Sequence, residues 1–333
     1  MMKLALVGAT GLVGKTALTI LSRLPVTELI PVASERSYGK SISFNDKDIR
    51  IQSIERALEM KPDIAIFSAG SELSKEYAPL FSSKGCYVID NSSAWRMDKD
   101  VPLVVPEING DQLTRDHYLI ANPNCSTIQM VMVLFPIARI YGLKKVIVST
   151  YQSVTGSGYQ GLAQLISERE ERKVDKPAYP YPIDLNCIPH CDRFLENDYT
   201  REEMKLVYES RKIMDMPHLP VHATAVRVPV IGGHSESVYI ELEKPFEIQE
   251  IRTLLARSPG IKVLDDPATG QYPMPAIAHK KDEVFVGRIR KDIDNEKALG
   301  LWIVADNLRK GAAGNAIQIA GIIHQRFISD APA

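Results

Sequence analysis

The chain has 333 residues, with 40 basic and 41 acidic side chains and a formal net charge of −1. This length allows two domains, while the balanced charge and short apolar runs exclude nucleic acid and a membrane as expected partners. The four cysteines are too few for a disulfide framework and predict a reducing, cytoplasmic compartment.

The first element is an apolar strand predicted at residues 3–7. It is followed by the glycine-rich segment GATGLVG at 8–14, and then by a helical pattern with Leu18, Leu21 and Leu24 on one face. Strand, glycine turn and helix are the first unit of a Rossmann domain, in which the turn admits a pyrophosphate at the helix N-terminus. The spacing is GxxGxxG rather than GxGxxG, so its position between strand and helix carries the prediction.

The second strand, predicted at 29–33, bears on the choice of cofactor. It ends in Ser34-Glu35-Arg36-Ser37, where an NAD-binding chain usually presents an acidic residue to the ribose 2′-hydroxyl. A guanidinium between two hydroxyls suits a 2′-phosphate instead, which favours NADP. Glu35 is the contrary observation, because its carboxylate is able to serve NAD.

Three further strands are predicted at 63–67, 87–90 and 118–121, with a helix at 73–84. Alternation of strands and helices predicts a parallel sheet wrapped by helices.

The segment Asn122-Pro123-Asn124-Cys125-Ser126-Thr127 places a cysteine directly before an apolar, helix-patterned stretch. A thiol at a helix N-terminus faces unpaired backbone N–H groups and the positive end of the helix dipole, which stabilise a thiolate. The same N–H groups could hold the oxyanion that forms when the thiolate attacks a carbonyl. The alternative is a buried cysteine in a turn.

A strand at 144–151 follows, and it ends in Gln152 and the loop 153–158, which is rich in serine and glycine. The loop is either a ligand-binding loop or an ordinary turn beside a surface glutamine. After a helix at 161–173, the proline-rich stretch 175–189 predicts an irregular segment that could serve as an oligomer contact. Cys187, His190 and Cys191 invite a zinc interpretation, which we disfavour because no second cysteine pair completes four ligands.

The next helix opens at residues 201–205, with Thr200 as its N-cap and Glu203 as capping-box partner. Glu202 and Lys205 are three apart and share a face, either functionally or as an exposed ion pair. Arg227 lies in a strand at 221–228. His234, beside two glycines between two strands, is expected to be accessible and to titrate near neutrality.

Taken together, these segments resemble the aspartate-β-semialdehyde dehydrogenase family from end to end. The matching motifs, in chain order, are GATGLVG (8–14), SERSYGK (34–40), NSSAWRMDKDVPLVVPEIN (91–109), NPNCST (122–127), TYQSVTGSG (150–158), REEMK (201–205), RVPVIGGHSESVYIE (227–241) and DNLRKGAAGNAIQIAG (306–321). Cys187 and Cys191 depart from the pattern, where apolar residues are expected around the family's IPH element.

The resemblance implies a role for each matching residue. Cys125 would be the nucleophile, His234 the general acid/base and Gln152 the residue that orients the acyl group. The substrate and its phosphate would be held by Arg96, Asn124, Glu202, Lys205 and Arg227, with phosphate at Arg96 and Lys205 and the amino-acid end at Arg227 and Glu202. NADP would meet Gly8, Thr10, Gly11, Leu12, Val13, Ser34, Arg36, Ser37, Thr155, Gly156 and Asn307, and no metal is implied.

The implied reaction is the reversible reductive dephosphorylation of L-aspartyl-4-phosphate to L-aspartate 4-semialdehyde through a cysteine thioester. It would serve the biosynthesis of lysine and diaminopimelate, methionine and threonine. The near alternative is another thioester-forming reductase, such as N-acetyl-γ-glutamyl-phosphate reductase. The alternative outside enzymes is an inactive paralogue that binds nucleotide as a sensor or scaffold.

The implied fold is α/β, with an N-terminal Rossmann domain (a parallel, doubly wound sheet) and an α+β catalytic and dimerisation domain. Residues 1–125 and 306–333 would form the first and residues 126–305 the second, with a C-terminal helix at 307–326 returning to the first. The protein would self-associate as a homodimer or a tetramer.

Overall fold

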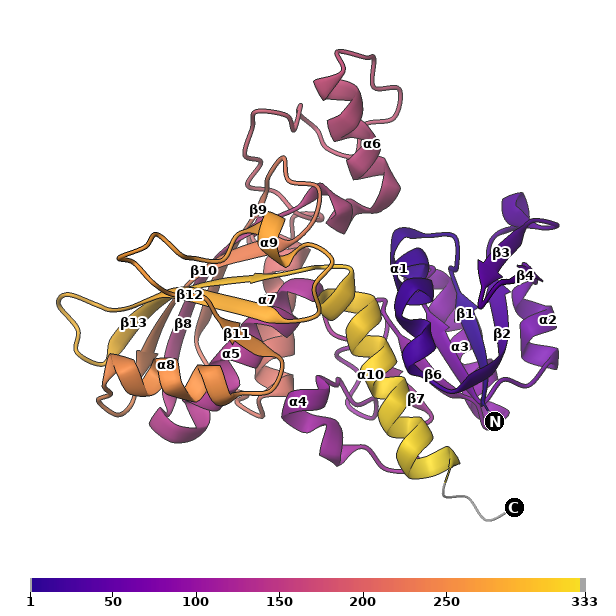
Figure 1. The fold of residues 1–333 in the computed structure, drawn as a ribbon, viewed down its shortest axis with the longest axis horizontal. Helices are drawn as coiled ribbons and strands as arrows, with labels where there is room; N and C mark the ends of the chain where they lie inside the picture. Colours follow the sequence, from indigo (N-terminus) through magenta and orange to yellow (C-terminus); the bar gives the residue numbers. More distant parts are fainter. Residues whose placement is uncertain (1, 330–333) are drawn as a thin grey trace. The chain divides into compact units, whose positions relative to one another are not determined.

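The computed structural model describes residues 2–329, which divide into two compact units (Figure 1). The first unit comprises residues 2–123 and 312–329, and the second comprises residues 124–311. The boundaries fall before Asn124 and before Ala312, whereas the sequence placed them after residue 125 and before residue 306. Asn124 and Cys125 therefore belong to the second unit. Each unit has its own sheet.

The first unit contains the predicted parallel sheet, which is confirmed with strand order β2-β1-β5-β6-β7. Every neighbouring pair in it is parallel. Its strands are β1 (Met2–Val7), β2 (Val26–Val32), β5 (Ile64–Phe67), β6 (Tyr87–Asp90) and β7 (Leu119–Ala121).

Helices cover both faces of this sheet, as the apolar runs in its strands require. Leu4 and Leu6 of β1 pack into one core, and Ala5 and Val7 pack into another on the opposite face. The first core includes residues of α1 (Leu12–Ile20) and α10 (Gly314–Ile323); the second includes residues of α2 (Ile54–Glu59) and α3 (Ser71–Ser83). The unit also holds the short helices α4 (Pro106–Asn109), η1 (Leu21–Arg23), η2 (Glu35–Ser37), η3 (Gly110–Gln112) and η6 (His324–Ile328).

A small hairpin in this unit was not predicted from sequence. β3 (Ser41–Phe44) and β4 (Lys47–Arg50) pair antiparallel across a two-residue turn. Asn45 and Asp46 in that turn have φ values of 50° and 59°, the left-handed conformation that a tight hairpin turn of this kind requires. The hairpin follows the turn that carries Ser34 and Arg36.

The second unit contains a mixed sheet with strand order β11-β12-β13-β10-β8-β9. The pairs β8–β9 and β11–β12 are parallel and the others are antiparallel, which confirms the expected combination of a Rossmann sheet with an α+β unit. Its strands are β8 (Leu143–Gln152), β9 (Val221–Arg227), β10 (His234–Leu242), β11 (Ile261–Val263), β12 (Val284–Lys291) and β13 (Ala298–Ala305).

The longest helix of this unit, α5 (Cys125–Tyr141), packs against β8, β10, β12 and β13. Residues 126–134, in its first half, are all buried and are apolar or small except Gln129. Figure 1 shows α6 (Gly158–Arg169) standing away from the sheet, where it packs with the irregular segment that follows it. The remaining helices are α7 (Arg201–Ile213), α8 (Ile248–Arg257), α9 (Pro275–Ala278) and η4 (Val154–Ser157), and η5 (Arg309–Ala313) begins in this unit and ends in the first.

Several predicted boundaries moved. The helix expected at 161–173 is α6 at Gly158–Arg169, and it stops before Glu171, whose φ is 52°. The helix expected from 307 begins instead with the π-helical turn η5.

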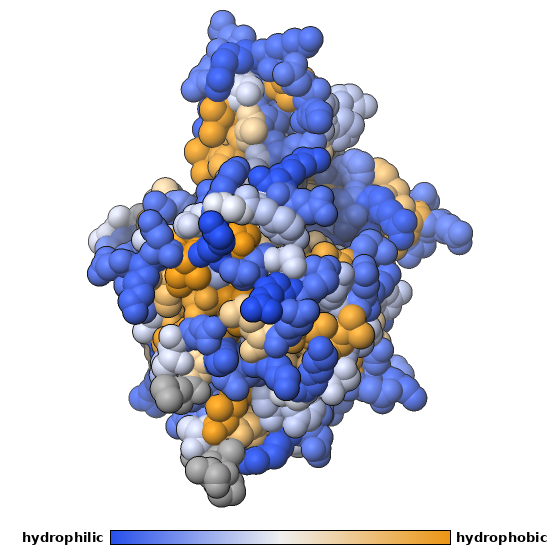
Figure 2. Space-filling view, turned by 90° about the vertical axis from the view of Figure 1, so that its right-hand side faces the viewer, coloured by the Kyte–Doolittle hydropathy of each residue, from blue (hydrophilic) through white to orange (hydrophobic). Residues whose placement is uncertain are grey.

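None of the helices within residues 2–329 is both long and apolar enough to cross a membrane. Figure 2 shows hydrophilic residues over most of the face that it presents, with hydrophobic residues in smaller areas between them.

Candidate active site

Cys125 is the first residue of α5, and Asn124 is the N-cap of this helix. The side-chain oxygen of Asn124 accepts hydrogen bonds from the backbone N–H groups of Ser126 (3.0 Å) and Thr127 (3.2 Å). The expectation that these N–H groups are unpaired is therefore wrong, because the cap already uses them. The helix dipole still favours a thiolate at Cys125, which is partly exposed.

Two buried carboxylates of α7 hold this helix terminus. The side-chain N–H of Asn124 donates to Glu202 Oε1 at 2.8 Å, and its backbone N–H donates to Glu209 Oε2 at 2.6 Å. Thr200 caps α7 and forms the predicted capping box with Glu203, which is confirmed. The capped start of α7 thus fixes the start of α5.

Gln152 lies at the end of β8 and is buried, so the alternative of a surface glutamine is wrong. Its side-chain N–H group donates to Ser126 Oγ at 2.9 Å and to Glu202 Oε1 at 3.2 Å. Gln152 therefore belongs to the same network as the N-cap of the cysteine helix.

His234 is fully buried as the first residue of β10. The backbone N–H of Ser153 donates to His234 Nδ1 at 3.1 Å. Because an N–H group can only donate, Nδ1 is an acceptor, and the neutral ring carries its proton on Nε2. Among residues 2–329, Nε2 has no hydrogen-bond partner.

Burial, together with the charge of Arg227, lowers the pKa of His234 to about 3. The expectation that this histidine is accessible and titrates near neutrality is therefore wrong. The two glycines before it do not expose the ring, because β10 begins at His234 itself and pairs with β8 and β13. The ring is neutral at physiological pH.

Arg227 ends β9 and is buried beside His234. Its NH1 group donates to the backbone oxygen of Ser153 at 2.7 Å, and its guanidinium lies 5.8 Å from the centre of the Tyr179 ring. Its Nε atom is buried without a partner among the described residues. Arg227 thus supports the residue that orients His234 and keeps one donor for a ligand.

Gly156 brings the 153–158 loop close to these two side chains. A Cβ atom added at Gly156 would lie 2.6 Å from Arg227 NH1 and 3.2 Å from His234 Nε2. A residue with a side chain would fill the space beside both donors.

Asn307 ties this loop to the glycines before His234. Its Oδ1 accepts from Ser153 Oγ at 3.0 Å and from the backbone N–H of Gly233 at 3.2 Å, and its Nδ2 donates to Thr155 Oγ1 at 3.2 Å. Thr155, Gly156 and Asn307, expected at the cofactor, are therefore neighbours in the second unit.

Lys205 donates to Glu202 Oε2 at 2.8 Å and to Asp192 Oδ2 at 3.0 Å. Burial by itself raises the pKa of Glu202, but the charge and hydrogen bond of Lys205 outweigh it and lower the pKa to about 2. The exposed-pair alternative is wrong, because Glu202 is buried. This unit thus brings together Asn124, Cys125, Gln152, Glu202, Lys205, Arg227 and His234 around the N-terminus of α5.

The other residues expected at the dinucleotide, Gly8, Thr10, Gly11, Leu12, Val13, Ser34, Arg36 and Ser37, lie in the first unit. Gly8 has a φ of 89°, and an added Cβ would lie 2.5 Å from the backbone oxygen of Ser68, so only glycine fits this turn. Gly11 is the N-cap of α1 and offers no side-chain acceptor, which leaves the first-turn N–H groups near Thr10, Leu12 and Val13 to a phosphate. This geometry fits a dinucleotide.

Ser34, Arg36 and Ser37 lie on or beside η2, directly after β2. Arg36 and Glu35 are both exposed, so either side chain is able to reach a ribose there.

Arg96 also lies in the first unit, where it is buried. Its Nε donates to the backbone oxygen of Asn122 at 2.9 Å, and NH2 donates to that of Asn91 at 2.8 Å. Part of its function is therefore to fix two loops, in addition to the phosphate contact expected from the resemblance.

Sequence reasoning missed three acidic residues. Glu209 follows Glu202 by seven positions, which places both on one face of α7, and this spacing was the available signal. Glu236 is fully buried on β10, and neither carboxylate oxygen has a hydrogen-bond partner among residues 2–329. No local pattern in the sequence indicated that Asp192 contacts Lys205.

Within residues 2–329, no group of three or more His, Cys, Asp or Glu residues is placed to hold a metal ion. Cys187 is exposed and Cys191 is buried, and burial raises the pKa of Cys191 to about 12.

Two family models match most of the chain. The model described as semialdehyde dehydrogenase, NAD binding domain, matches residues 3–115, and that described as semialdehyde dehydrogenase, dimerisation domain, matches residues 134–310. Fold and site together therefore define a member of the semialdehyde dehydrogenase class.

Individual relatives narrow this class. The chain is 49% identical to an aspartate-semialdehyde dehydrogenase of Aquifex aeolicus (strain VF5), over 96% of this chain and 97% of the other. It is 47% identical to that of Legionella pneumophila, over 98% and 97%. Aspartate semialdehyde dehydrogenase II from Vibrio cholerae, solved in complex with ASA, superimposes with a TM-score of 0.94 at 42% identity, over 98% of this chain and 99% of the other. The chain belongs to the aspartate-semialdehyde dehydrogenase family.

Proposed function

We propose that this protein is an NADP-dependent aspartate-semialdehyde dehydrogenase that interconverts L-aspartyl-4-phosphate and L-aspartate 4-semialdehyde through a thioester on Cys125. One observation carries the proposal: Cys125 begins a helix whose N-cap shares a hydrogen-bond network with Gln152 and Glu202. Family membership supports it, because all the residues that the resemblance assigns to the chemistry are present.

In the biosynthetic direction the Cys125 thiolate attacks the acyl phosphate carbon. A C–S bond forms, the C–O bond to phosphate breaks, and inorganic phosphate leaves with the bonding pair. Lys205, with Arg96 as a second cation, offsets the charge of the leaving group. Arg227 and Glu202 hold the carboxylate and ammonium ends of the substrate.

His234 donates from Nε2 to the oxygen that gains charge at the reacting carbon. The Nε2 tautomer, set by Ser153, suits this role because the donor is already protonated in the neutral ring. When the tetrahedral adduct collapses to aldehyde and thiolate, the ring keeps its Nε2 proton and the hydrogen bond passes to the aldehyde oxygen. The bound nicotinamide supplies the hydride that reduces the thioester.

The turn after β2 supports NADP, because Arg36 offers a guanidinium to a 2′-phosphate. NAD remains the alternative cofactor, because the Glu35 carboxylate is able to bind the ribose 2′-hydroxyl. The product would enter lysine and diaminopimelate, methionine and threonine biosynthesis, as the resemblance implies. A reducing, cytoplasmic compartment fits a nucleophile that must remain a thiol.

The test is a spectrophotometric assay with aspartate semialdehyde, phosphate and NADP, followed at the nicotinamide absorbance. Cys125→Ser should retain fold and cofactor binding but fall below a tenth of the wild-type rate, because a serine hydroxyl does not ionise at neutral pH. Retention of a larger rate, which corresponds to a loss under ~1.4 kcal/mol, would remove Cys125 as nucleophile.

One further substrate and a cofactor-binding measurement separate the alternatives. Activity with N-acetyl-glutamate semialdehyde in place of aspartate semialdehyde would indicate the related reductase. Cofactor binding without any turnover of either aldehyde would indicate an inactive paralogue.

A further inference from the structure

The ammonium of Lys205 lies between two carboxylates. Its Nζ atom is 2.8 Å from Glu202 and 3.0 Å from Asp192, and the three side chains are 18%, 9% and 32% exposed in that order. Although partial burial opposes it, the charge of Lys205 lowers the pKa of Asp192, so both acids are ionised at neutral pH. The Lys205 ammonium is thus paired with two carboxylates, although the proposed function requires it to bind a phosphate.

The two carboxylates are held differently. Glu202 is buried on α7 and accepts hydrogen bonds from Asn124 and Gln152, so it cannot leave without breaking that network. Asp192 lies outside any helix or strand. Besides its pairing with Lys205, its Oδ1 accepts a hydrogen bond from the backbone N–H of Arg193 at 2.9 Å. Asp192 is therefore the carboxylate that can move.

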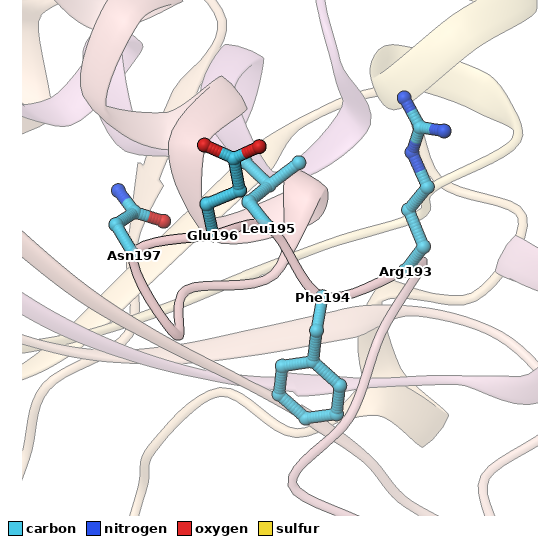
Figure 3. A pocket seen from close by; sticks show the side chains of 5 residues that line it. All are labelled: Arg193, Phe194, Leu195, Glu196 and Asn197. Carbon is cyan, nitrogen blue, oxygen red and sulfur yellow. The ribbon is translucent and has the colours of Figure 1, made fainter.

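The segment after Asp192 forms an open loop on the protein surface. Phe194 and Thr200 form an isolated bridge that closes the loop, and residues 193–197 line a shallow pocket of about 540 Å³. Figure 3 shows the side chains of Arg193 and Phe194 pointing in opposite directions from this loop. The backbone of Asp192 is left-handed, with a φ of 66°, which asparagine and aspartate tolerate better than other side chains.

We propose that Asp192 is an intramolecular competitor for the phosphate subsite, which occupies Lys205 until inorganic phosphate or the substrate phosphoryl group displaces it. Carboxylate and phosphate oxygens are equivalent acceptors for an ammonium, so both cannot take the same Lys205 donor. The proposal rests on the proposed function, in particular on the assignment of Lys205 to phosphate. It makes Asp192 a residue that sets the affinity for phosphate.

The variant Asp192→Asn tests the effect of the negative charge of Asp192 alone. Asparagine tolerates the same backbone conformation, and its amide oxygen is able to accept from the Arg193 N–H group, so the loop is retained. Asp198→Asn is the matched control, because Asp198 lies in the same loop with a φ of 63° and is exposed. Among residues 2–329, Asp198 forms no ion pair with Lys205.

The experiment measures the phosphorylating reaction of the intact enzyme, with phosphate varied and sulfate added as a competing inhibitor. In Asp192→Asn, the KM for phosphate and the inhibition constant for sulfate should each fall about three- to tenfold, because a neutral amide competes less well than a carboxylate for the Lys205 ammonium. The KM for aspartate semialdehyde should change less than about twofold in this variant. All three constants should stay within about twofold of wild type in Asp198→Asn.

The proposal is overturned if the KM for phosphate in Asp192→Asn is unchanged or higher than in wild type. If a higher KM for phosphate is accompanied by tighter sulfate binding, Asp192 is a phosphate ligand instead. The variant Lys205→Met distinguishes a failure of the competitor proposal from a failure of the proposed function. If the proposed function holds, Lys205→Met raises the KM for phosphate, and adding Asp192→Asn to it has no further effect. If Lys205→Met leaves that KM unchanged, the assignment of Lys205 fails and the competitor proposal fails with it.

Discussion

At the scale of single residues, Arg227 combines two functions. Its guanidinium holds the backbone oxygen of Ser153, which in turn orients His234, and its Nε remains for a ligand. A planar guanidinium can pair with a carboxylate through two parallel hydrogen bonds, and a lysine ammonium cannot.

Arg227→Lys should therefore raise the KM for aspartate semialdehyde about ten- to a hundredfold, since the loss of a charged hydrogen bond costs roughly 1.5–3 kcal/mol. The KM values for phosphate and NADP should change much less, and kcat should fall because Ser153 loses a partner. Steady-state constants measured separately for the three substrates test this. A selective effect on phosphate would mean that the two ends of the substrate site are reversed.

Glu236 gives a second residue-scale prediction. Its burial between Thr150 of β8 and Ile303 of β13 raises the pKa of its carboxyl well above the usual value. Above the unfolded pKa of about 4.3, the native carboxyl therefore keeps its proton to a higher pH than the unfolded chain does. The folded state then binds more protons, so this group reduces stability as pH rises above the unfolded pKa, by up to ~1.4 kcal/mol per unit.

Glu236→Gln should consequently be more stable than wild type at pH 7, and its advantage should grow between pH 5 and pH 7. Denaturant unfolding at several pH values measures the difference. Glu241→Gln is the control, because Glu241 lies on the same strand but is only partly buried and pairs with Lys145 at 3.8 Å. A pH-independent difference for Glu236→Gln would show that this carboxyl is ionised in the native protein.

At the scale of elements, α7 organises the site from one helix. Glu202, Lys205 and Glu209 occur at positions i, i+3 and i+7 and therefore share a face. The two acids bind the N-cap of α5, while the lysine faces Asp192. Because the capping box at Thr200 fixes the first turn, these side chains keep their positions relative to Cys125.

The turn after β2 carries the prediction for the cofactor. Arg36→Ala should raise the KM for NADP much more than that for NAD, because only NADP has a 2′-phosphate for the guanidinium to pair with. Comparison of the two cofactors in the wild type and the variant decides this. If Arg36→Ala raises the KM for NADP and the KM for NAD equally, Glu35 becomes the residue assigned to the ribose. Glu35→Gln should then selectively weaken the binding of NAD.

At the scale of the whole molecule, one face of the second sheet remains partly exposed. Ile147, Tyr151, Tyr239 and Trp302 lie there, on neighbouring strands. Since the dimerisation-domain model covers this sheet, we expect these residues to contact a second copy of the chain.

Light scattering should therefore give twice the chain mass of 37.1 kDa. Tyr239→Glu should shift the protein toward the monomer, because a buried unpaired charge is costly at an interface. Tyr181→Glu serves as the comparison, because Tyr181 is 65% exposed in the proline-rich segment. Dissociation by Tyr181→Glu alone would place the contact in that segment, and a mass of four chains would indicate the tetramer.

Local signals in the sequence were sufficient for much of this molecule. Apolar runs and glycine turns predicted the parallel sheet, Pro-Asn before an apolar helix placed Cys125 at a helix start, and Thr200 with Glu203 predicted the capping box. Hydrogen bonding within a few residues and side-chain periodicity decide such features, and both are visible in a short window.

Other features depended on residues far apart in the chain. The His234 ring is buried and holds its proton on Nε2 because Ser153, 81 positions earlier, donates to Nδ1. Glu209 reaches the backbone of Asn124 across 85 positions. By itself the sequence determined the strands of the parallel sheet, the nucleophile candidate and the family; the tertiary structure decided which charges are buried, paired or opposed, because desolvation and ion pairing depend on what the fold packs beside each group.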